Sequence, residues 1–244
     1  MAGHSKWANI KHKKGRMDAA KGKVFTRITK EIINAVKQSG ADPKSNPKLR
    51  LALQKAKAVN LPNENIERNI KKATSKDQAD YVEITYELYG HGGVGLLVEI
   101  MTDNKNRIAS DMRIATNKRG GTIATPGAVA FNFDRKGVIQ VSKEALTEEQ
   151  MFEAVAETGA EDFDQNNELY LVITSPEDLY KVKEGLEAKN IAIEEAGFEQ
   201  FPKVYVECDE EMTKANLALI EWLEELDDVD AVYHNMQINE VIGD

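Results

Sequence analysis

The hydrophobic pattern of the chain changes its period near residue 80, and this change limits the folds available to it. Before residue 80, apolar residues recur every three or four positions, as they do in amphipathic helices. In the first such segment they are Phe25, Ile28, Ile32 and Val36. After residue 80, short runs typical of strands alternate with helical segments. The sequence therefore predicts an α+β multidomain protein whose first part is entirely helical.

Three short helices are expected in the first part. The first spans residues 17–39, the second begins with Ser45 or Asn46 as its cap, and the third spans 63–74. Pro47 would occupy the first helical position of the second helix, where its missing N–H is tolerated. Short connections between amphipathic helices favour a three-helix bundle. Because no recognition helix stands out, the helices give no indication of sequence-specific reading of bases.

Two strands are expected next, at residues 82–89 and 94–101, with a glycine-rich turn between them. Gly90, Gly92 and Gly95 match the pattern G-x-G-x-x-G. A dinucleotide site needs a helix after this pattern, whereas a second strand follows here, so we expect a hairpin. The elements predicted after the hairpin are a helix at 104–119 capped by Thr102 or Asp103, and strands at 129–133 and 138–141 separated by a turn at 134–137.

The following segment has the element order of a ferredoxin-like fold: strand, helix, strand, strand, helix, strand. Thr147 and Gln150 form a capping box at the start of its first helix, and Ser175 with Pro176 marks the start of the second. Its remaining strands are expected at 162–164, 169–174 and 191–198.

The end of the chain supplies elements that complete the domain begun at residue 82. They are a strand at 204–208, a helix ending at 226 and a strand at 229–238. We therefore predict an N-terminal three-helix bundle followed by two α+β domains, one ferredoxin-like and inserted in the other. The predicted boundaries are 1–76 for the bundle and its basic arm, 77–134 and 203–244 for the discontinuous α+β domain, and 135–202 for the inserted domain.

Charge is divided between the same parts. Residues 1–76 contain 15 Lys and 4 Arg against 2 Asp and 3 Glu, a net charge of +14, whereas residues 77–244 carry −23. Concentrated positive charge is typical of a protein that binds nucleic acid, because it displaces counterions condensed on phosphates. The alternative is a lysine-rich surface that only keeps the domain soluble. We expect nucleic acid to bind through residues 1–76.

Candidate contacts come from the arm, from one helix face and from a second helix. Trp7 in the arm can stack on an exposed base or pack on the first helix. Four basic residues lie within about 80° of each other on the side of the first helix opposite its apolar stripe. A second phosphate contact near residues 104–107 is a less favoured alternative. The predicted contacts are Lys6, Trp7, Lys11, His12, Lys13, Lys14, Arg16, Lys23, Arg27, Lys30, Lys37, Lys105 and Arg107.

No catalytic, metal or cofactor site is predicted. Cys208 is the only cysteine, and the four histidines lie far apart without metal-ligand spacing. The chain shows no nucleophile elbow and no Walker loop, so we expect a protein that is not an enzyme and has no small-molecule substrate. Without a secretory signal or a membrane-spanning segment, the expected location is the cytoplasm, away from membranes.

Several long stretches resemble the YebC/PmpR family, and the resemblance covers the whole chain. They include AGHSKWANIKHKK at 2–14, NPKLRL at 46–51, NIER at 65–68 and TDNKNR at 102–107. His91, Ala124 and Ala128 depart from the family pattern and place only turn details in doubt.

This resemblance implies the architecture predicted above and a cytoplasmic, DNA-binding transcriptional regulator. It also implies an alternative, because family members include a mitochondrial translational activator and have been linked to ribosomes stalled on proline-rich sequence. The alternative is a translation factor that binds ribosomal RNA. A further alternative is an interaction module whose acidic body docks the ribosome or basic proteins, such as ribosomal proteins.

Overall fold

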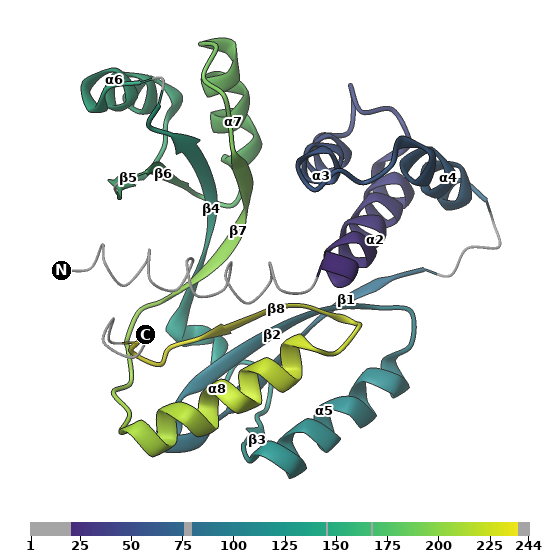
Figure 1. The fold of residues 1–244 in the computed structure, drawn as a ribbon, viewed down its shortest axis with the longest axis vertical. Coiled ribbons are helices and arrows are strands. Elements are labelled where there is room, and N and C mark those ends of the chain that lie inside the picture. Colours follow the sequence, from purple (N-terminus) through teal and green to yellow (C-terminus); the bar gives the residue numbers. More distant parts are fainter. Residues whose placement is uncertain (1–20, 76–79, 145, 167, 239–244) are drawn as a thin grey trace. The chain divides into compact units, whose positions relative to one another are not determined.

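The structure, a computed structural model, describes residues 21–75, 80–144, 146–166 and 168–238 (Figure 1). The predicted arm contacts at positions 6–16 therefore lie outside the described residues. The chain divides into two compact units, of which one contains residues 134–201 and the other contains the described residues on both sides of that segment. The predicted boundary at residue 76 stays a prediction.

A three-helix bundle begins the larger unit, as predicted. Its helices are α2 (Lys21–Ser39), α3 (Pro47–Ala58) and α4 (Asn63–Ala73). Asn46 is the N-cap of α3: its side chain accepts from the Leu49 N–H and donates to the carbonyl oxygens of Ala35 and Gly40. The cap therefore also ties the start of α3 to the end of α2. The buried core of the bundle includes Ile28, Ile32, Ile33, Val36, Leu49, Ala52, Ala56 and Ile66.

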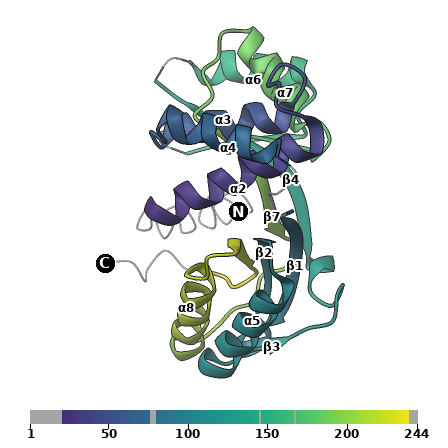
Figure 2. The same cartoon turned by 90° about the vertical axis from the view of Figure 1, so that its right-hand side faces the viewer.

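The rest of the larger unit is an antiparallel sheet in the order β3-β1-β2-β8. Its strands are β1 (Val82–Tyr89), β2 (Gly95–Thr102), β3 (Thr122–Ile123) and β8 (Val229–His234). Two helices, α5 (Lys105–Arg119) and α8 (Glu210–Glu224), lie on one face of the sheet, as both views show (Figures 1 and 2). Their shared core includes Leu88, Leu96, Val98, Ile100, Ile108, Met112, Leu219, Ile220 and Leu223.

The other face of this sheet carries acidic side chains. Side chains alternate along a strand, and Leu88 and Val98 point to the helices, so Glu83 and Glu87 on β1 and Glu99 on β2 point to the opposite face. Glu87 is 7% exposed, and its carboxylate accepts from the N–H groups of Gly127, Val129 and Ala130 at 2.6, 2.6 and 2.8 Å. It thereby holds the segment before η2 (Ala130–Asn132) against one end of this face.

The second unit is the predicted ferredoxin-like fold. Its elements are β4 (Phe133–Ser142), α6 (Glu148–Thr158), β5 (Asp162–Gln165), β6 (Leu169–Thr174), α7 (Leu179–Ala188) and β7 (Glu195–Pro202). The strand order β5-β6-β4-β7 places β4 and β6 at the centre, which is the ferredoxin-like order. The capping box of Thr147 and Gln150 is confirmed, with both hydrogen bonds present. The α+β multidomain fold class is thus confirmed.

Several predicted elements were wrong in detail. The turn at 134–137 does not exist, because β4 runs unbroken through these polar residues and 130–132 forms η2 instead of a strand. Helix α7 begins three residues later than expected: Ser175 bonds Asp178 and caps a turn before the helix. The last strand of this unit begins at Glu195, because Asn190 has a positive φ and the chain after it is irregular.

Two corrections concern the larger unit. Asn104, not Thr102 or Asp103, caps α5 by accepting from the N–H groups of Asn106 and Arg107. The strand predicted at 204–208 is reduced to one bridge between Val206 and Met236.

Candidate nucleic-acid interface

Three residues of the predicted cationic face of α2 lie against the α+β domain. The Lys23 Nζ donates to the backbone carbonyl oxygens of Glu224, at 3.2 Å, and Glu225 at the end of α8. The Arg27 Nη1 donates to the carbonyl oxygen of Asp230 at 2.8 Å. A helix C-terminus presents unsatisfied carbonyl groups and a partial negative charge, so a lysine there is stabilising.

Lys30 is the most buried residue of this face, with 7% of its surface exposed. Its ammonium donates to the carbonyl oxygens of Met101, at 3.1 Å, and Asp227, at 2.8 Å, and to the Oδ1 of Asp228 at 3.0 Å. Three acceptors match the three donors of an ammonium group. The prediction that Lys30 contacts a phosphate directly does not fit this arrangement, because acceptors of the same chain already take its three N–H donors.

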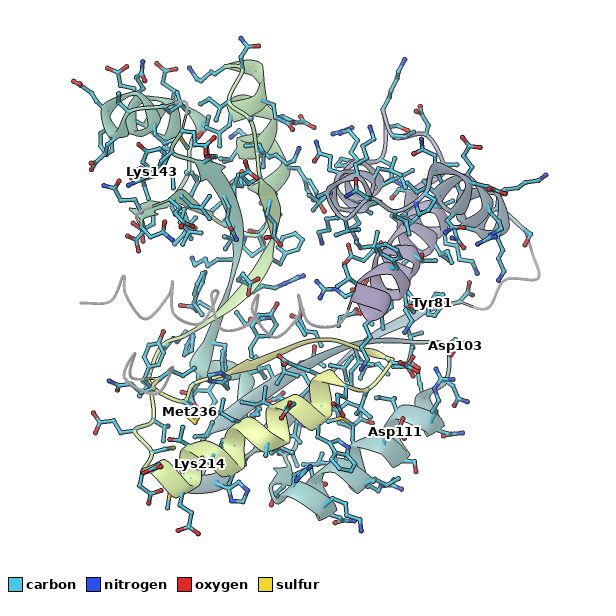
Figure 3. All side chains as sticks on the ribbon, viewed as in Figure 1. Tyr81, Asp103, Asp111, Lys143, Lys214 and Met236 are labelled. Atoms are coloured by element: carbon cyan, nitrogen blue, oxygen red, sulfur yellow. The ribbon has the colours of Figure 1, made fainter. Side chains whose placement is uncertain are left out.

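Asp228 is the centre of the contact. Its Oδ2 accepts from Arg107 Nε at 2.9 Å, from Arg107 Nη2 at 2.6 Å and from the Thr102 hydroxyl at 2.9 Å. Burial would raise the pKa of Asp228, but the hydrogen bonds from Lys30, Arg107 and Thr102 outweigh burial and lower it. Arg107 also bonds Asp103, which Figure 3 labels beside Tyr81. Asp228 is therefore an ionised carboxylate shared by the two domains.

We name this set of contacts the clamp. On one side are Lys23, Arg27 and Lys30 of α2. On the other side are their acceptors in the α+β domain and the two residues that also bond Asp228: Met101, Glu224, Glu225, Asp227, Asp228, Asp230, Thr102 and Arg107. Sequence reasoning assigned these three cations to a partner molecule and missed Asp228. The opposite net charges of the two parts of the chain were the feature that could have indicated an internal partner. Of the other predicted contacts, Lys37 pairs with Asp80 and Arg107 belongs to the clamp. Lys105 is exposed, with no partner among the described residues.

A second acidic group lies beside the clamp. Burial raises the pKa of Asp230 to about 7, with Glu31 and Glu99 adding to the shift and Arg27 and Lys30 opposing it. Glu31 itself is ionised, because Lys55, at 2.9 Å, and Arg27, at 3.4 Å, outweigh the effect of burial on its pKa. Asp230 and Glu31 therefore add two carboxyl groups to the charges around the α2 contact.

Solvent-facing positive charge lies elsewhere on the bundle. Six basic residues on and around α3 and α4 are exposed, and none of them forms an ion pair with a described residue. Within the described residues, Lys48 and Arg68 bond the neutral side chains of Gln38 and Asn65, and no described carboxylate neutralises their charges. We call these six the outer cations: Lys44, Lys48, Lys57, Arg68, Lys71 and Lys72.

Two kinds of feature are absent from the described part of the chain, a metal-binding cluster and a membrane-spanning helix. No group of three His, Cys, Asp or Glu side chains within it is arranged to hold a metal ion. None of the helices in these residues is long and apolar enough to cross a membrane.

Comparison with known proteins gives matches over nearly the whole chain. Residues 5–76 match the family described as the TACO1/YebC protein N-terminal domain, and residues 81–236 match the TACO1/YebC second and third domain. A probable transcriptional regulatory protein of Protochlamydia amoebophila is 67% identical over 98% of both chains. Another, from Chlamydia pneumoniae, is 59% identical over 97% of this chain and 100% of its own.

A solved structure is also similar. The crystal structure of a conserved hypothetical protein from Aquifex aeolicus matches with a TM-score of 0.85 and 41% sequence identity, covering 98% of this chain and 100% of that one.

Proposed function

We propose that this chain, which belongs to the TACO1/YebC family, is a non-enzymatic, cytoplasmic regulator of gene expression that binds nucleic acid through its basic N-terminal part. The proposal favours DNA and transcription, in keeping with the names of its relatives, which are probable transcriptional regulatory proteins. The observation that carries it is the set of outer cations, which face solvent without carboxylate partners among the described residues.

The physical argument has two steps. Cations already paired with carboxylates release few counterions from a nucleic acid, whereas unpaired exposed cations release about one each. The outer cations therefore contribute most of the affinity of the described bundle, and the basic residues at positions 6–16 of the sequence add further positive charge. Since phosphate contacts carry no sequence information, this surface suits binding by shape and charge.

Binding by shape and charge suits RNA as well as duplex DNA, so the second candidate is a translation factor that binds ribosomal RNA. Ultraviolet crosslinking of the intact protein in cells, followed by sequencing of the bound DNA and RNA, separates the two. Enrichment at promoters supports the transcriptional regulator. Enrichment in ribosomal RNA without promoter peaks refutes direct transcriptional control and supports the translation factor. A variant with Lys57, Lys71 and Lys72 changed to Gln is the control, because it should lose either signal.

A further inference from the structure

We propose that the clamp is an autoinhibitory latch, in which the acidic edge of the α+β domain occupies cations of α2 that nucleic acid competes for. The inference rests on the proposed function, because nucleic acid is the competing ligand. In the latched state Lys23, Arg27 and Lys30 bind oxygen atoms of the same chain. In the open state they face solvent and add to the outer cations.

The acceptors in the latch resemble a phosphate backbone in chemistry. Lys23 binds carbonyl oxygens at the negative end of α8, and Lys30 binds two carbonyl oxygens and the carboxylate of Asp228. Phosphate oxygens offer a charged acceptor to each of these cations. A polyanion therefore offers new acceptors to the cations of α2 when the helix leaves the domain, while the hydrogen bond that Asn34 donates to Glu83 at 2.7 Å is lost.

The contact is polar, and this makes it reversible. The core of the bundle and the core between the sheet and helices α5 and α8 are separate apolar clusters. Lys30 joins the two parts through hydrogen bonds and an ion pair, and its ammonium lies 5.8 Å from the centre of the Tyr81 ring. Buried ion pairs add little net stability, since desolvation offsets their attraction. Opening therefore leaves both hydrophobic cores intact.

Opening also leaves no buried charge without a partner. Asp228 keeps the two hydrogen bonds from Arg107 and one from Thr102, all within the α+β domain. Lys30 gains water in place of its three acceptors. Glu31 keeps Lys55, which belongs to the bundle. Each side of the latch thus remains satisfied when the two sides separate.

The test compares Asp228→Asn with Asp227→Asn in the full-length chain. Both changes remove one negative charge from adjacent positions, but the Asp227 side chain is exposed and only its backbone oxygen takes part in the latch. The first readout uses no nucleic acid: the distance between spin labels at Ala58 on α3 and Glu221 on α8, with Cys208 changed to Ser. We expect Asp228→Asn to add a population of longer distances and Asp227→Asn to match the parent chain.

The second readout is the affinity for a duplex DNA of random sequence. The apparent affinity is the affinity of the open state multiplied by the fraction of molecules that are open, so a latch that is closed most of the time lowers it. We expect Asp228→Asn to bind about fivefold or more tightly than the parent, Asp227→Asn to bind less than twofold more tightly, and DNA to lengthen the label distance in the parent chain. Equal affinities of the two variants would overturn the latch.

Lys30→Met is a second variant for the case that Asp228→Asn folds poorly. It removes the same ion pair from the other side, and Lys30 is not part of the bundle core. The latch predicts longer label distances in this variant, and unchanged distances would contradict it. Failure of the parent chain to bind any nucleic acid would refute the proposed function, whereas the distances would still show whether the clamp opens.

Discussion

Removing three outer cations should weaken the salt dependence of nucleic-acid binding by a calculable amount. Lys57, Lys71 and Lys72 are exposed and have no ion pair with a described residue. Each lysine that neutralises a phosphate of duplex DNA adds about 0.9 to the slope of log affinity against log salt concentration. Changing all three to Gln should therefore reduce the slope by up to about 2.7. When the salt concentration rises from 50 to 200 mM, the variant should then lose about 40-fold less DNA affinity than the parent chain loses.

The assay is fluorescence anisotropy with a labelled duplex at four or more salt concentrations. A matched control changes Lys181, Lys189 and Lys214 to Gln, which removes the same charge from exposed positions on the acidic domains. The control should leave the slope within about 0.5 of the parent value. A control that lowers the slope as much as the outer variant would show that affinity follows net charge, and would refute the assignment of the surface.

Three further predictions concern the fold around the site. Because burial raises the pKa of Asp230 to about 7, the folded chain holds a proton that the unfolded chain releases, so this residue lowers stability as pH rises through the range from about 4 to 7. Asp230→Asn should therefore raise the melting temperature more at pH 8 than at pH 5, because only part of this pH range lies below pH 5, whereas the same shift at both pH values would contradict the assignment. Glu87→Gln replaces a carboxylate that accepts from three N–H groups and should lower the free energy of unfolding by about 2–3 kcal/mol. Amide hydrogen exchange at residues 127–130 should become faster, and unchanged exchange there would disprove the role of Glu87. Leu49→Ala empties a fully buried position in the bundle and should cost about 2–5 kcal/mol in denaturant unfolding, while Lys48→Ala beside it should stay within about 0.5 kcal/mol.

Elements specified by neighbouring residues were predicted well. The capping box of Thr147 and Gln150 and the start of α3 at Asn46 and Pro47 depend on contacts three residues apart or fewer, so the sequence shows both partners. Elements that depend on distant contacts were placed less well. The polar residues 134–137 resemble a turn, but β6 pairs with β4 from Gly137 onward and the strand continues through them.

The candidate site shows the same limit. A helical wheel identifies the side of α2 opposite the bundle core, but it does not tell whether water or another domain covers that side. Lys30 and its partner Asp228 are 198 residues apart, and no local pattern connects them. By contrast, the exposure of Lys71 and Lys72 follows from their place at the end of an amphipathic helix with one buried stripe. The total charge of the bundle was informative, whereas the division between paired and unpaired cations required the structure.

The central claim is that nucleic acid binds the basic N-terminal part of this chain and not its acidic domains. Mapping crosslinked peptides by mass spectrometry, on full-length protein irradiated in cells, tests this claim directly. The account predicts nucleotide adducts on peptides from residues 1–75, including the segment from Lys57 to Lys72. Adducts confined to peptides from residues 81–238 would contradict it.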